Sequence, residues 1–227
     1  MTTAAQVKKI VRPLLERHAD LALVGRWIYV KPVHHVARAV LIDRMLNPEK
    51  FRPQWAVVHL FEAQEFFPLD WGEWLYNETS PTPGSWKISD PDIATALISA
   101  IEQQALPQLR SIKTLNHYLA FVSRHMFGHK LFDWPQCKII VDVALGDLDA
   151  ARAICEEKMH RWSVDQPQHD EDSKEKYRRL RELCARLAAN DRAGLAQLLH
   201  EWEACTVRNF KIEQLWEPTP FPLEQAA

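Results

Sequence analysis

Glycine is scarce in this 227-residue chain, which contains only six. Average usage of about 7% would give roughly sixteen glycines at this length. No two of the six lie within eleven residues of each other. The sequence therefore contains no G-x-G-x-x-G or G-x-x-x-x-G-K-[ST] phosphate-binding loop and no G-x-S-x-G nucleophile elbow. These absences exclude the common nucleotide-binding loops and the usual α/β-hydrolase nucleophile.

The chain also lacks long apolar runs and a large net charge. Its 28 Lys and Arg residues against 30 Asp and Glu give a formal net charge of −2, which provides no overall attraction to nucleic acid or to an anionic membrane. No apolar run approaches the roughly 18 residues of a membrane-spanning helix. Residues 1–12 contain no apolar segment typical of a secretory signal. We therefore expect a cytoplasmic protein that is not associated with a membrane and does not bind nucleic acid.

Cysteine is rare as well, with four residues and no C-x-x-C motif. Each cysteine falls within a helical pattern, which predicts reduced thiols in the core of a cytoplasmic protein. Thiol chemistry or a zinc site is the alternative. The four residues are Cys137, Cys155, Cys184 and Cys205.

Apolar residues make up 47% of the chain, enough to form a folded core. Their spacing predicts a helix over 4–17. The period then changes, and β-branched residues predict strands at 27–30, 33–44 and 54–61. The connections between these strands are too short for parallel crossovers, so we expect an antiparallel meander. A further short strand is expected at 85–89.

From Asp90 onward the pattern is helical. Gly146-Asp147 and Asn190-Asp191 each resemble the end of one helix followed by the N-cap of the next. They lie in segments that align at a 44-residue offset, which predicts two stacked helical hairpins, with coincidental helix punctuation as the alternative.

The expected fold is therefore α+β: an N-terminal helix and a three- to four-stranded antiparallel sheet, followed by an all-helical C-terminal half of stacked hairpins. We expect an α+β domain over 1–112 with a Trp- and Pro-rich loop at 66–91. A helical region over 113–210 is expected to pack on it, and an extended tail follows over 211–227.

The loop at 66–91 is rich in aromatic residues and long for a compact domain. Its large amphipathic side chains are of the kind that dominates protein interfaces, although they could equally pack the loop onto the sheet. Arg38, on a neighbouring strand, offers a guanidinium fork for an anion. The leading hypothesis is a non-catalytic module that binds another protein through this loop and the adjoining sheet face. The predicted binding residues are Arg38, Trp71, Trp74, Tyr76 and Trp86.

The competing hypothesis is a small-molecule hydrolase with an acid–base pocket on the sheet, in which a carboxylate orients an imidazole. Its candidate residues are His35, Arg38, Asp43 and His59. His125 and His129 have the four-residue spacing of two metal ligands on a helix, but no Glu follows the first His as in zinc proteases. No cofactor is expected. Oligomeric state cannot be inferred from these patterns.

A basic stretch over 174–186 is interspersed with glutamates. This spacing favours an exposed, salt-bridged helix over a nucleic-acid footprint.

The run Leu23-Val-Gly25-Arg-Trp27-Ile-Tyr-Val, followed by His35-Val-Ala-Arg38-Ala-Val-Leu-Ile-Asp43, resembles a class of uncharacterised bacterial α+β proteins known as domains of unknown function. The resemblance covers about the first half of the chain. It implies a bacterial intracellular protein that works by binding, and it brings no activity and no functional residue with it.

Overall fold

The computed structural model describes residues 3–69, 71–77, 86–124, 135–158 and 171–225. The chain forms two compact units. The first, called here the sheet unit, comprises Met1–His59, Glu65–Arg124 and Val207–Pro218. The second, the helical unit, comprises Leu60–Gln64, His125–Thr206 and Thr219–Ala227. Each unit is built from three separate segments of the chain.

The sheet unit begins with helix α1 (Ala4–Arg17), over the span that the apolar pattern predicts. Thr3 is its N-cap and forms a capping box with Gln6, in which each side chain accepts a hydrogen bond from the other residue's backbone. Val7, Val11 and Leu14 form its buried face.

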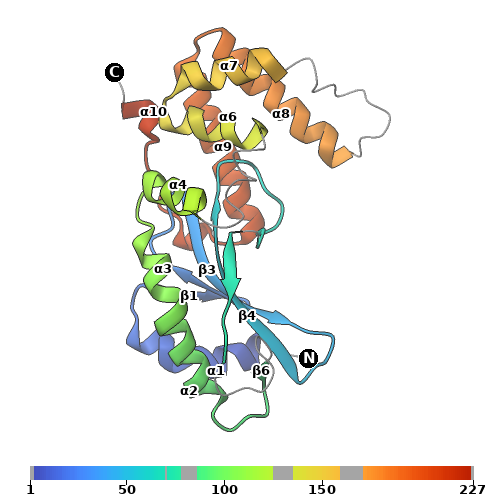
Figure 1. Ribbon diagram of the computed structural model, residues 1–227, viewed down its shortest axis with the longest axis vertical. Coiled ribbons are helices and arrows are strands. Elements are labelled where there is room, and N and C mark those ends of the chain that lie inside the picture. The colour runs from blue at the N-terminus through green and yellow to red at the C-terminus, as the bar shows by residue number, and fades with distance from the viewer. Residues whose placement is uncertain (1–2, 70, 78–85, 125–134, 159–170, 226–227) are drawn as a thin grey trace. The chain divides into compact units, whose positions relative to one another are not determined.

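The sheet is antiparallel, with the strand order β1-β2-β3-β4-β5 (Figure 1), and a sixth strand also pairs with β4. The strands are β1 (Leu21–Val24), β2 (Trp27–Val30), β3 (Val36–Arg44), β4 (Lys50–His59), β5 (Gly72–Trp74) and β6 (Trp86–Lys87). The α+β fold is confirmed. β1 and β5 are additional to the strands expected from the sequence. Gly25, with φ of 62°, occupies the first position of the two-residue β1–β2 turn, where type II′ hairpins require positive φ.

The β3–β4 register determines which side chains share a face. Arg38 pairs with Val57, whereas Asp43 pairs with Arg52. Because side chains alternate along a strand and directly opposed residues share a face, Arg38 and His59 lie on one face and Asp43 and Arg52 on the other.

Helices cover the face that carries Arg38 and His59. They are α2 (Ile93–Ala100), the π-turn η1 (Ile101–Ala105), α3 (Leu106–Ser111) and α4 (Leu115–Arg124). Phe121 of α4 packs against Trp55, with ring centroids 5.7 Å apart. We call this face the helix-covered face.

The opposite face is covered along only part of its length. Phe67 stacks on Trp27 at 4.4 Å between ring centroids, and Phe210 stacks on Phe67 at 5.3 Å. Farther along β4, alternate residues from Lys50 to Gln54 are partly exposed, whereas every residue from Trp55 to His59 is buried. The opposite face is therefore open over residues 50–54.

The helical unit contains α6 (Pro135–Leu145), α7 (Leu148–Lys158), α8 (Glu171–Ala188) and most of α9 (Arg192–Phe210). Gly146 and Asn190 have left-handed φ values of 86° and 54°. The Asp147 and Asp191 carboxylates accept hydrogen bonds from the backbone of the following helix. Both predicted cap pairs are confirmed, and they divide the helices into the hairpins α6–α7 and α8–α9.

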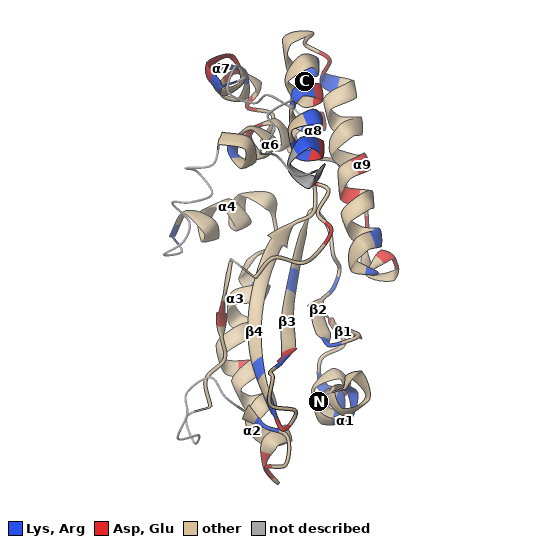
Figure 2. Cartoon of the chain, turned by 90° about the vertical axis from the view of Figure 1, so that its right-hand side faces the viewer, with Lys and Arg blue, Asp and Glu red and all other residues tan. Residues whose placement is uncertain are grey.

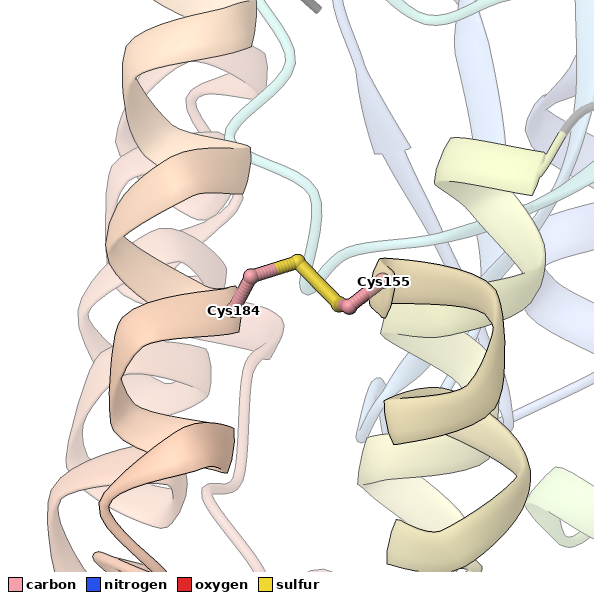
Figure 3. The surroundings of a disulfide bond; sticks show 2 residues. All are labelled: Cys155 and Cys184. Atoms are coloured by element: carbon pink, nitrogen blue, oxygen red, sulfur yellow. A yellow bond between two sulfur atoms is a disulfide. The ribbon is translucent and has the colours of Figure 1, made fainter. Parts of the chain in front are cut away.

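A disulfide bond joins Cys155 of α7 to Cys184 of α8, with 5.9 Å between the Cα atoms (Figure 3). The expectation of reduced core thiols is therefore wrong for these two residues. Each had been assigned correctly to a helical pattern, but a sequence does not show which helix faces pair. Cys137 and Cys205 remain outside any disulfide.

The segment from residue 211, predicted to be extended, contains two short helices, η3 (Glu213–Leu215) and α10 (Pro222–Gln225). Within the sheet unit, Trp216 forms a β-bridge with Val33. Within the helical unit, Phe221 contacts Phe61 edge to face at 5.4 Å. Every helix in the described parts of the chain is too short or too polar to cross a membrane.

Candidate functional site

Arg38 is buried on the helix-covered face, and its side chain donates hydrogen bonds to backbone carbonyl groups. Its guanidinium donates hydrogen bonds to the carbonyl oxygens of Pro32 at 2.8 Å and Ile112 at 3.0 Å, with a longer one to Val30 at 3.5 Å. Burial lowers the pKa of Arg38, and the negative charge of Asp20 opposes that effect. The prediction that Arg38 binds an external anion is wrong, because its donors are committed to carbonyl groups that burial would otherwise leave unpaired.

The predicted acid–base pocket is not assembled. His59 is buried on the helix-covered face, where its Nδ1 shares a hydrogen bond of 2.9 Å with the Tyr118 hydroxyl. Asp43 lies on the opposite face, seven register positions along β3 from the residue that pairs with His59. His35, also buried, stands just before β3. The hydrolase pocket is therefore wrong: alternation along β3 was read correctly, but the register with β4 is a long-range property.

The aromatic residues predicted to bind a partner divide into two groups. Trp71 and Trp86 are only 7% and 1% exposed. Trp86 stacks with Phe51 and donates its indole N–H to the Leu75 carbonyl. Both residues are core, which corrects their assignment as surface residues. Trp74 and Tyr76, by contrast, are 45% and 49% exposed. Residues 70 and 78–85 of the loop lie outside the described structure.

Trp74 is held in place on the open part of the sheet. It pairs with Gln54 across β4 and β5, and its indole N–H donates to the Gln54 side-chain oxygen at 3.1 Å. The Gln54 amide in turn donates to the Leu69 carbonyl at 3.0 Å. The Arg52 guanidinium lies 4.1 Å from the centre of the Trp74 ring, a cation–π contact. The arrangement presents an aromatic ring and a cation together at the surface.

Gly72 allows β5 to approach β4 closely enough for this arrangement. A Cβ atom at Gly72 would lie 1.9 Å from the Trp55 carbonyl oxygen, which is backbone and cannot rotate away. Trp74 is two residues farther along the same strand. The glycine therefore positions the exposed indole through the strand pairing.

Charged residues lie along the face of β4 that carries Gln54, the residue paired with Trp74. Lys50 of β4 and Lys87 of β6 are directly opposite each other, on the face that carries Arg52. Asp43 opposes Arg52, but its carboxylate is 3.5 Å from Arg26. Figure 2 shows Lys and Arg positions in blue on β4 toward its hairpin with β3. We call the following five residues the open face: Lys50, Arg52, Gln54, Trp74 and Lys87.

Sequence reasoning identified only Trp74 among these five. The signal for the β4 residues was present in Lys50-Phe-Arg52-Pro-Gln54-Trp, where polar and apolar residues alternate strictly. The strand predicted over 54–61 begins four residues too late, because the observed strand starts at Lys50.

A polar cluster lies inside the helical unit. The Cys137 thiol is 3.6 Å from a Glu62 carboxylate oxygen, and the Lys176 ammonium is 3.2 Å from the other. Burial, and then the Glu62 charge, raise the pKa of Cys137. Burial, the largest single effect, would lower the pKa of Lys176, but Glu62 together with Cys137 and Tyr177 outweighs it and the net shift is upward. A thiol that stays protonated is a poor nucleophile, so we assign the cluster a structural role. Through Glu62 it links residues 60–64 to Cys137 of α6 and Lys176 of α8.

Metal ligation has no support among the residues that the structure describes, where no group of three or more His, Cys, Asp or Glu side chains is arranged to hold an ion. The predicted ligands His125 and His129 lie outside those residues. On α8, glutamates pair with Arg178, Arg179 and Arg186, which matches the expected salt-bridged helix.

Comparison of the chain with models of known protein families, with curated proteins and with solved structures gives no match. The resemblance to bacterial domains of unknown function therefore stays a prediction.

Proposed function

We propose that this protein is a non-catalytic binding module that recognises another protein through the open face of its sheet. The observation that carries the proposal is the position of Trp74, a large aromatic side chain that is 45% exposed yet fixed by Gln54 and Arg52. An aromatic residue that is already ordered loses little conformational entropy on binding, which is why Trp and Arg dominate interface hot spots.

The open face also differs from the polar sites inside the sheet unit. Arg38 and His59 are buried and bonded to groups of the protein itself. Trp74 instead presents nearly half of its surface to solvent. A side chain of this kind is available to a partner, whereas the buried pair is not.

The test is quantitative affinity capture from a native lysate, comparing wild type with Trp74→Ala. We expect at least one protein to be retained by wild type and reduced about tenfold or more with Trp74→Ala, because truncating a hot spot costs about 2 kcal/mol or more. Leu46→Ala is the matched control, since Leu46 is fully exposed and is not one of the five residues of the open face. Equal retention by wild type and Trp74→Ala would remove the proposal.

A bacterial cytoplasmic location belongs to the same proposal. Disulfides are rare in the reducing cytosol, and Cys155 is bonded to Cys184 in the structure, so the location needs a direct test. Fractionation of the native cells, followed by detection of the protein with an antibody, should recover it in the cytoplasmic fraction. Recovery outside that fraction would contradict the location.

A further inference from the structure

Three cationic side chains of the open face have no anionic partner among the residues that the structure describes. Among the described residues, the side chains of Lys50, Arg52 and Lys87 form no ion pair and donate no hydrogen bond. The contact of Arg52 is with the Trp74 ring, and its Nε is buried without an acceptor. Asp43, the carboxylate opposite Arg52, lies instead beside Arg26.

This placement is unfavourable for the isolated protein. Lys50 and Lys87 are directly opposite each other on β4 and β6, and like charges at such positions destabilise a sheet. On α8, by contrast, Arg179 and Arg186 each have a glutamate one turn away. The open face therefore concentrates positive charge in a protein whose net charge is −2.

Arg52 brings the chemistry of anion recognition to this face. Its guanidinium carbon lies 4.1 Å from the centre of the Trp74 ring, and no carboxylate among the described residues pairs with it. A carboxylate can accept two parallel hydrogen bonds from such a fork.

We infer that the open face binds an acidic segment of a partner protein, with carboxylates meeting Arg52, Lys50 and Lys87 and a neighbouring apolar group meeting Trp74. This inference rests on the proposed function and names the chemistry of the partner. A cluster of three cations can pair with two or three carboxylates, which is the number that a short acidic segment provides. A nucleic-acid backbone would need a longer basic track.

The test measures the anisotropy of a fluorescent ten-residue glutamate peptide, with a glutamine peptide of the same length as reference. Wild type is expected to bind the glutamate peptide at least about tenfold more tightly. The triple variant Lys50→Gln, Arg52→Gln, Lys87→Gln should lose about tenfold in affinity, because three exposed ion pairs together are worth roughly one decade. Added salt should weaken wild-type binding.

A second triple variant, Lys8→Gln, Lys9→Gln, Lys113→Gln, controls for total charge. It removes three exposed lysines that lie away from the open face, and it should bind the peptide like wild type. Equal losses in the two triple variants would overturn the inference, and so would equal affinity of wild type for the two peptides. Tighter binding of a ten-residue thymidine oligonucleotide, or of phosphatidylserine vesicles, through the same three residues would also overturn it.

Lysate capture separates this inference from the proposed function. If a partner is lost with Trp74→Ala but kept by the open-face triple variant, the protein-binding function stands and the acidic partner is refuted. If both variants keep every wild-type partner, both proposals fail.

Discussion

The two halves of β4 differ in what surrounds their polar residues. In the half from Trp55 to His59 every side chain is buried. The polar groups at this end, His59 and the neighbouring Arg38, are bonded to Tyr118 and to backbone carbonyls. In the half from Lys50 to Gln54 alternate side chains are partly exposed, and the partner of the Arg52 side chain among the described residues is an aromatic ring. The partners of a polar residue, more than its chemical type, therefore distinguish a structural role from a binding role.

The largest expected effect comes from Arg38→Met, which retains length but removes the donors to the Ile112 and Pro32 carbonyls. Because buried acceptors would be left unpaired, we expect the free energy of unfolding in urea to fall by about 3 kcal/mol. A loss below about 1 kcal/mol would mean that Arg38 contributes as little to stability as we expect of Arg52.

Gly72→Ala should disturb the pairing of β5 with β4 at Trp55 and Ala56, where the open and buried halves of β4 meet. Its Cβ would collide with the Trp55 backbone, so β5 must shift away from β4. We expect a loss of about 2 kcal/mol in unfolding free energy, as for other overpacked sites, together with weaker partner capture because Trp74 moves with the strand. A variant with wild-type stability would show that β5 does not pair as described.

Tyr118→Phe removes the hydroxyl that bonds to His59 and leaves the ring. One net hydrogen bond corresponds to about 1 kcal/mol, measurable as a shift of the urea midpoint at unchanged slope. Partner capture should be unaffected. Loss of a partner with this variant would mean that the buried half also takes part in binding.

Asp20, between α1 and β1, makes the stability of the protein depend on pH. The Arg110 guanidinium, which donates two hydrogen bonds to this carboxylate, holds the pKa of Asp20 below its usual value. Stability from this pair is present above the unfolded pKa of about 3.9 and is lost as the pH falls through the lower folded pKa. Wild type should therefore exceed Asp20→Asn near neutral pH by less than about 1 kcal/mol, since the pair is partly exposed, and the difference should vanish in acid. A constant difference down to pH 2 would contradict this account.

Arg52→Gln is expected to have the smallest effect on stability, within about 0.5 kcal/mol of wild type, because only the contact with the exposed Trp74 ring is lost. Urea unfolding of this variant beside Arg38→Met compares an arginine of the open half of β4 with the arginine of β3 that is paired with the buried half. Similar losses in both would remove the distinction.

Local signals predicted much of the fold. The apolar periodicity over 4–17, the Gly146-Asp147 and Asn190-Asp191 caps and the β-branched runs act over a few residues, and the elements they define are present. β5 was not predicted, because three residues around Gly72 carry too little periodicity to indicate a strand.

The candidate site was harder to predict than the fold. Trp71, Trp74 and Trp86 are equivalent in sequence terms, and only tertiary packing buries two of them and exposes the third. The separation of Asp43 from His59 depends on the β3–β4 register, and the Cys155–Cys184 bond depends on how α7 packs against α8. These are long-range contacts that local patterns do not encode.

The central claim, that the open half of β4 is a binding surface, is tested most directly by oxidative footprinting of tryptophan with and without the captured partner. We predict that Trp74 becomes several-fold less reactive in the complex, as expected for a buried hot spot, while the buried Trp86 stays unreactive in both states. Unchanged reactivity of Trp74 in a saturated complex would contradict the account.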